Sequence, residues 1–259
     1  MINKKVTPFL NLLLFAGVVT VNALANILPI NGYNTGQVSA FYPNFFVPAG
    51  FTFSIWGVIY LILTGFVVIS FFAAFGKFDE AAGKAVQQAS PWFWLTCVIN
   101  ASWVLVWHHL YLATSWLLML AFLAVLIRMF LLLKPLKNKI PVFHRIWVYH
   151  AFVVYLAWIS VATIANTTAL LVGFGWQGGF LSPQVWSVIM ICIAIFLGIA
   201  MVGKRKEPAY GFVLSWAFYG IYSAQVSQAR IVGITAAIGV CVLLALTITI
   251  LIKVPKRAA

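Results

Sequence analysis

Residues 50–75 read GFTFSIWGVIYLILTGFVVISFFAAF, a run without a single acidic or basic side chain. A helix that crosses a bilayer needs about 20 consecutive and mostly apolar residues. The run is long enough, and it lacks the period-two alternation of a membrane β-barrel strand. Because only helices and closed barrels satisfy every backbone polar group in lipid, this stretch predicts a transmembrane helix.

The apolar character of this run extends over the whole chain. Of the 259 residues, 64% are hydrophobic and 7% are charged, and the mean hydropathy is +1.06. A soluble domain carries about 25% charged residues. We therefore predict an all-α, polytopic membrane helix bundle with about eight transmembrane helices. The predicted spans are 7–29, 50–75, 92–111, 113–133, 147–173, 184–203, 208–226 and 230–252.

The basic residues give a net charge of +13, and their positions alternate along the chain. They precede the first span, fill every second connection and close the chain, whereas the other connections hold almost none. They are Lys4, Lys5, Lys77, Lys84, Lys134, Lys137, Lys139, Arg145, Lys204, Arg205, Lys206, Lys253, Lys256 and Arg257. This pattern predicts a multi-pass protein of the cell (inner) membrane with both termini cytoplasmic. It assigns the charge to lipid head groups, and we expect no nucleic-acid partner.

The first span shares features with a cleavable signal peptide. Lys4 and Lys5 precede an apolar run that ends in Ala23-Leu24-Ala25. The run is longer than a signal peptide requires and contains Asn11. We expect a retained helix, and cleavage would leave seven spans.

Acidic residues are scarce and lie outside the predicted spans. Asp79, Glu80 and Glu207 all fall in connections that should face the cytoplasm. A carboxylate at membrane depth is what general-base catalysis or cation coupling would use. The sequence therefore favours a binding protein over an enzyme, and it disfavours a carboxylate-coupled carrier.

Other candidate chemical groups also have structural interpretations. His108 and His109 end the third span, where polar anchoring at the head groups is favoured over haem or metal ligation. Arg128 lies close enough to a span end to extend toward the interface. The cysteines fall in apolar spans and predict neither a disulfide nor a metal site; they are Cys97, Cys192 and Cys241.

Three predicted helices each carry a stripe of rings and amides. The stripes are Phe53, Trp56 and Tyr60; Asn100, Trp103 and Trp107; and Tyr155, Trp158, Ala162 and Asn166. Spacings of three and four residues place side chains on one helix face. Aliphatic side chains would suffice for lipid contact. The stripes therefore indicate surfaces turned toward other helices and, as a hypothesis, toward a flat ligand. Hydrogen bonding between helices is the alternative role of the amides.

The same segments resemble a known family. Residues 48–60, PAGFTFSIWGVIY, resemble the second helix of the tryptophan-rich sensory protein or translocator protein family (TspO/MBR). Asn100-Ala-Ser-Trp103 is similar to its third-helix Asn-x-x-Trp motif. Residues 158–166, WISVATIAN, are similar to its fifth-helix Trp-x-x-x-Ala-x-x-x-Asn motif. Order and spacing agree across about residues 7–173.

This resemblance implies a five-helix membrane domain at 1–178 whose pocket binds porphyrins and related flat hydrophobic ligands. Residues 179–259 would then form a three-helix membrane extension. Carried over by position, the pocket would include Pro48, Trp56, Tyr60, Asn100, Trp103, Trp158, Ala162 and Asn166, with Phe53 and Trp107 added by helical phase. The implied function is a sensor or carrier, and no cofactor is expected beyond a porphyrin or haem-like ligand.

The chain departs from the family pattern in several places, one of them Ser54, where a proline is expected two residues before Trp56. The usual Trp-x-Pro-Pro before the second helix is Phe46-Val-Pro48-Ala here, and the residues after Asn166 lack the segment associated with cholesterol. We therefore do not expect cholesterol binding. Three further hypotheses stay open: a transporter of small hydrophobic solutes in one chain or a homodimer, a tetrapyrrole-modifying enzyme, and a structural scaffold.

Overall fold

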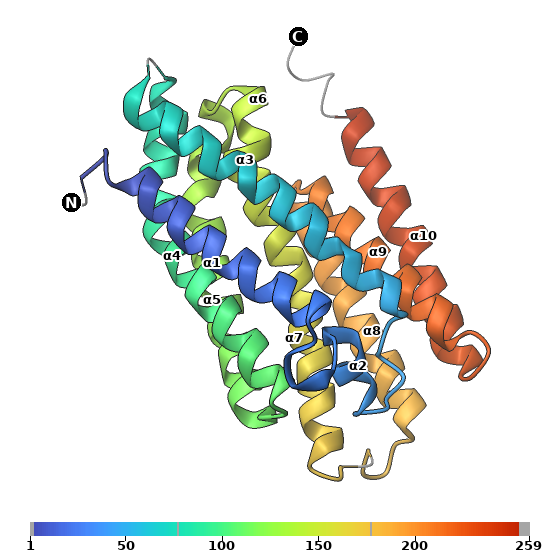
Figure 1. Ribbon diagram of the computed structural model, residues 1–259. Coiled ribbons are helices and arrows are strands. Elements are labelled where there is room, and N and C mark those ends of the chain that lie inside the picture. Colours follow the sequence, from blue (N-terminus) through green and yellow to red (C-terminus); the bar gives the residue numbers. More distant parts are fainter. Residues whose placement is uncertain (1–2, 77, 177, 254–259) are drawn as a thin grey trace. The chain divides into compact units, whose positions relative to one another are not determined.

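The computed structural model describes residues 3–76, 78–176 and 178–253 (Figure 1). The described residues form helices and the connections between them, and none lies in a strand. Seven of the described helices are long and apolar enough to cross a membrane. The predicted all-α, multi-pass class is confirmed. Of the predicted basic positions, Lys77, Lys256 and Arg257 lie outside the described residues.

Several helices form close to the predicted limits. They are α1 (Thr7–Ile27), α3 (Ile55–Phe75), α5 (Leu112–Leu133), α8 (Pro183–Ile199) and α10 (Arg230–Lys253). The 3₁₀ turn Gly50–Ser54 precedes α3, so the charge-free run is helical throughout. Apolar length alone was sufficient to locate these helices.

Helix α9 (Pro208–Gln225) also forms where a span is predicted, but it is not among the seven apolar helices. Its sequence contains three tyrosines, two serines and Gln225, which lower its hydropathy. Much of α9 is buried against other helices. Packing contacts, rather than lipid, therefore surround Tyr210, Ser215 and Gln225.

Helix α4 (Glu80–His108) starts well before the predicted limit at residue 92. Asp79 caps its first turn, because its carboxylate accepts a hydrogen bond from the Ala82 backbone N–H at 2.7 Å. A search for apolar runs misses such a polar first section. The following hairpin leads into α5.

Helix α7 (Ala151–Gly173) is preceded by the short helix α6 (Val142–Arg145) and by a π-helical turn at Ile146–His150. A second π-helical turn, Ala200–Lys204, ends α8. A π-helical turn holds one more residue than an α-helical turn and often marks a functional site. Neither turn was predicted.

The chain divides into two compact units. Unit 1 comprises the chain up to Val38 together with Ile55–Leu156, and unit 2 comprises Ser39–Ser54 together with the chain from Ala157 onward. The division at residue 178, which rests on family resemblance, stays a prediction. Each unit is described separately below.

In unit 1, α1 packs against α3 and α4, and α4 packs against α5 (Figure 1). Asn11 links α1 to α4, donating to Ser90 Oγ at 3.1 Å and accepting from Trp94 Nε1 at 2.7 Å. Phe66 makes edge-on ring contacts with Phe93 and Phe152 at 5.0 and 4.9 Å between centroids. Rings and a buried amide thus hold these helices in register.

In unit 2, α9 and α10 pack along each other, and α8 lies against both. Residues 47–52 also lie on α9. Trp216 Nε1 donates to Thr52 O at 3.0 Å, and the Ala49 N–H donates to Gly220 O at 3.0 Å. A Cβ on Gly220 would collide with Thr52, so glycine permits this close approach. Helix α9, to which the sequence assigned no role, therefore anchors the segment that carries Pro48.

Candidate functional site

Asn100 is the centre of a buried hydrogen-bond network in unit 1. Its Oδ1 accepts from Asn22 Nδ2 at 3.2 Å, and its Nδ2 donates to the Tyr155 hydroxyl at 2.7 Å and to the Tyr60 hydroxyl at 3.3 Å. Asn100 is fully buried. The amide therefore joins α1, α3, α4 and α7, which is the helix-linking role that the sequence left open.

Aromatic rings surround this network. Trp56 stacks on Tyr60 with centroids 5.6 Å apart and meets Tyr155 edge-on at 6.0 Å. Phe122 packs edge-on against Tyr155 at 5.1 Å. Trp56 and Tyr60 are half-buried, whereas Tyr155 is buried. Trp56 and Tyr60 of the second-span stripe thus lie with Asn100 of the third-span stripe and Tyr155 of the fifth-span stripe in unit 1.

The indoles of Trp103 and Trp107 stack in parallel on α4, with centroids 5.8 Å apart. Trp107 Nε1 donates to Thr35 O at 3.4 Å. Trp103 is buried, and within the described part of the chain its Nε1 has no hydrogen-bond partner. A buried N–H without an acceptor costs about 1–3 kcal/mol, so this donor needs an explanation.

His108 fastens residues 30–35 to the end of α4. Its Nδ1 lies 3.2 Å from Ile30 O, and its Nε2 lies 3.1 Å from Thr35 Oγ1. A carbonyl can only accept, so Nδ1 carries the proton and Nε2 accepts from the threonine hydroxyl. The ring is fully buried. His108 therefore holds residues 30–35 against α4, and it is not the head-group anchor that the sequence favoured.

Metal ligation finds no support among the described residues, which contain no group of three or more His, Cys, Asp or Glu side chains able to hold an ion. Arg128 is exposed and lies over the Trp92 ring at 5.8 Å from its centroid. A cation–π contact of this kind, together with exposure, accounts for the one basic side chain well inside a predicted span.

The remaining predicted site residues belong to unit 2. Phe53 meets Trp158 edge-on at 6.2 Å between centroids. Trp158 and Asn166 are buried, and Pro48 and Ala162 are half-buried. The structure thus brings Phe53 and Trp158 together within this unit.

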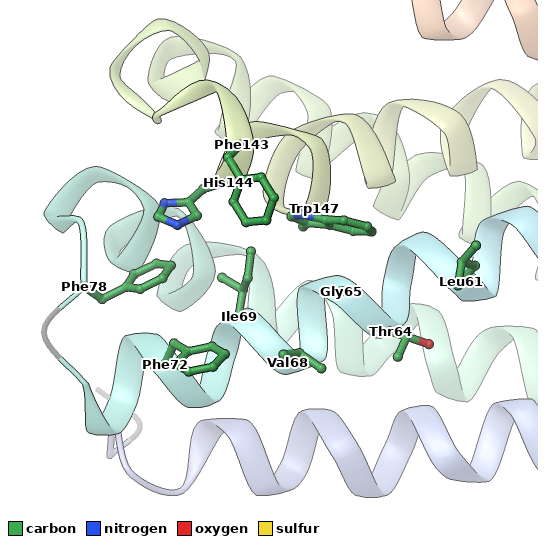
Figure 2. A pocket seen from close by; sticks show the side chains of 10 residues that line it. All are labelled: Leu61, Thr64, Gly65, Val68, Ile69, Phe72, Phe78, Phe143, His144 and Trp147. Atoms are coloured by element: carbon green, nitrogen blue, oxygen red, sulfur yellow. The ribbon is translucent and has the colours of Figure 1, made fainter.

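A pocket of about 540 Å³ lies elsewhere in unit 1 (Figure 2). One wall is formed by α3, through Leu61, Thr64, Gly65, Val68, Ile69 and Phe72. The other wall comprises Phe78, Phe143, His144 and Trp147. Sequence reasoning missed this pocket. The available signal was the small pair Thr64-Gly65 among bulky residues.

A family model described as TSPO-like protein matches residues 8–249. The chain belongs to the TSPO-like family. The TSPO-like match continues through α8 and α9 into α10, whereas the resemblance found from motifs ended near residue 173. The family match therefore includes most of the C-terminal helical region. Comparisons with curated proteins and with solved structures found no significant match.

Proposed function

We propose that this TSPO-like membrane protein binds porphyrin-like or other flat hydrophobic ligands and acts as their sensor or carrier. The observation that supports this function is the ring group of Trp56, Tyr60 and Tyr155 around Asn100. Half-buried Trp56 offers a ring on which a planar molecule stacks, and each ring pair contributes about 0.5–1.5 kcal/mol beyond area burial.

The polar groups of this ring group suit a ligand with acceptor atoms at its edge. Both Asn100 Nδ2 hydrogens are used by the tyrosine hydroxyls, so Asn100 orients the rings and does not itself donate to the ligand. Each tyrosine accepts from Asn100 and retains its own O–H as a donor. The buried Trp103 N–H is a further donor on the same face of α4 as Asn100.

The direct test is a titration of purified protein with protoporphyrin IX, followed by the porphyrin's absorbance. We expect Trp56→Leu to weaken binding about tenfold, which corresponds to about 1.4 kcal/mol. Trp92→Leu is the matched control, because Trp92 contacts Arg128 and is not part of the ring group. Equal affinity in both variants would show that Trp56 does not contact the ligand.

The predicted site residues of unit 2 need a separate test. Phe53→Leu and Trp158→Leu remove the two rings that meet edge-on. If this pair also contributes to binding, each variant weakens porphyrin affinity and the double variant weakens it less than additively. If affinity is unchanged, Pro48, Phe53, Trp158, Ala162 and Asn166 are removed from the proposed site.

A carrier moves porphyrin across the membrane, whereas a sensor binds it without moving it. Porphyrin entry into proteoliposomes that depends on Trp56 would identify a carrier, and saturable binding without flux would identify a sensor.

We also infer an inner-membrane location with both termini cytoplasmic, supported by the alternation of basic connections. In a background without the native cysteines, Lys139→Cys and Phe180→Cys place thiols in a basic and a neutral connection. A membrane-impermeant maleimide added to intact cells should label only position 180. Labelling at position 139 alone would show that the orientation is the reverse of the one inferred.

A further inference from the structure

We propose that the pocket between α3 and residues 143–147 is a site for an anionic phospholipid of the surrounding bilayer. One acyl chain occupies the apolar pocket, and the head-group phosphate lies beside His144 and Arg145. This site is separate from the Asn100 ring group and does not depend on porphyrin binding.

The pocket has the size and chemistry of a binding site for an apolar chain. Small-molecule sites typically enclose about 300–1,000 Å³ and combine apolar walls with few polar groups. This pocket encloses about 540 Å³. The Thr64 hydroxyl donates to Tyr60 O at 2.8 Å, so it is already satisfied. A chain of methylene groups therefore meets no unsatisfied polar group along α3.

The π-helical turn and Gly65 together build the wall of the pocket. Trp147 lies in the turn Ile146–His150, and its ring lies where a Cβ on residue 65 would be. Only glycine permits this approach. Figure 2 shows the Trp147 and Phe143 rings above α3, with the pocket beside Gly65. A backbone irregularity that places an indole against a glycine is a specific arrangement, not incidental packing.

His144 marks the polar end of the pocket. Its ring stacks on Phe78 with centroids 4.5 Å apart, and its buried Nδ1 has no hydrogen-bond partner within the described part of the chain. An apolar ligand would leave this nitrogen unsatisfied. A ligand with an acceptor at one end, such as a phosphate oxygen, would accept a hydrogen bond from it.

The charge beside His144 selects an anionic head group. The connection 134–145 carries four basic residues and no acidic one. Arg145 is held in place by donating Nε and Nη2 to Ile140 O at 3.3 and 2.9 Å. Asp79 and Glu80 follow Phe78, but Asp79 is engaged in capping α4. Basic residues near a membrane surface attract anionic lipid.

The bilayer itself supplies this ligand. Except for Phe78, the lining residues belong to candidate membrane spans, Gly50–Phe75 and Val142–Gly173. Val68 and Phe72 of the pocket are also exposed on the surface of the chain, so lipid reaches the pocket laterally. No passage from water is required.

The test is native mass spectrometry of the full chain released from nanodiscs of phosphatidylglycerol and phosphatidylcholine in equal amounts. We expect one phosphatidylglycerol to be retained per chain. Val68→Trp fills the pocket and should lower this retention at least fivefold. Val58→Trp is the matched control, because Val58 lies on the same helix, is 48% exposed against 49% for Val68, and does not line the pocket.

A second variant distinguishes recognition of the lipid head group from binding of the acyl chain. His144→Leu should retain lipid but lose the preference for phosphatidylglycerol over phosphatidylcholine. Equal retention in Val68→Trp and Val58→Trp overturns the site. A wild-type protein that retains both lipids equally overturns the anionic head-group assignment and leaves a neutral amphiphile as the occupant.

Discussion

Two regions of α3, one around Tyr60 and one around Gly65, differ in how the neighbouring side chains pack. Around Tyr60, aromatic rings pack on one another and Asn100 donates hydrogen bonds to two tyrosine hydroxyls. Around Gly65, the glycine admits the Trp147 ring, and a pocket lies next to a His144 nitrogen that has no hydrogen-bond partner among the described residues. The first region is a network of paired polar groups, and the second borders an apolar pocket.

This difference shows what conspicuous residues do and do not indicate. The aromatic and amide stripe predicted contact between helices correctly, because such side chains are costly in lipid unless they are paired. A cavity depends on where side-chain atoms are absent. In the sequence its only sign is a small residue among large ones, which is a weaker signal than a stripe of rings and amides. Three variants test these contacts and those of His108.

Asn100→Leu should give the largest effect. It removes three interhelical hydrogen bonds and leaves Asn22 and two tyrosine hydroxyls without this partner. At about 0.6–1.7 kcal/mol for each bond in a membrane protein, the free energy of unfolding should fall by about 3 kcal/mol. Titration of the solubilised protein with sodium dodecyl sulfate measures it. Asn26→Ala is the control, since among the described residues the Asn26 side chain bonds only to Asn22 O of its own helix. An equal fall in the free energy of unfolding in both variants would contradict the hydrogen-bond network around Asn100.

Gly65→Ala should give an intermediate effect. The added Cβ would collide with Trp147, and such overpacking costs about 1–3 kcal/mol. Gly57→Ala on the same helix meets nothing within 4 Å and should be neutral or stabilising by about 0.5–1 kcal/mol. The same denaturation measurement applies. A stabilised Gly65→Ala variant would mean that Trp147 does not lie against α3.

His108→Leu should give the smallest global effect, about 1–2 kcal/mol, because two hydrogen bonds are lost. Its main consequence should be local: amide hydrogens of residues 30–35 should exchange faster in deuterated buffer. His109→Leu is the control, since the exposed His109 ring has Leu105 O as its one hydrogen-bond partner within the described part of the chain. Unchanged exchange in His108→Leu would show that residues 30–35 are held by other contacts.

The candidate site was predicted from sequence in part. Helical spacing alone placed Trp56 on Tyr60 and Trp103 on Trp107, because i, i+3 and i+4 neighbours share a face. It could not reveal that α1 contributes Asn22 to the same network. That contact joins residues separated by 78 positions and depends on how whole helices pack.

The sequence by itself determined that this chain is a multi-pass helical membrane protein of the TSPO-like family. Long apolar runs leave the backbone no alternative in lipid, and that constraint is local. Only the tertiary structure decided that Asn100 is saturated by protein groups, that α9 holds residues 47–52, and that a pocket opens beside Gly65. Those outcomes depend on contacts between distant segments, and the pocket further depends on the irregular turn that carries Trp147.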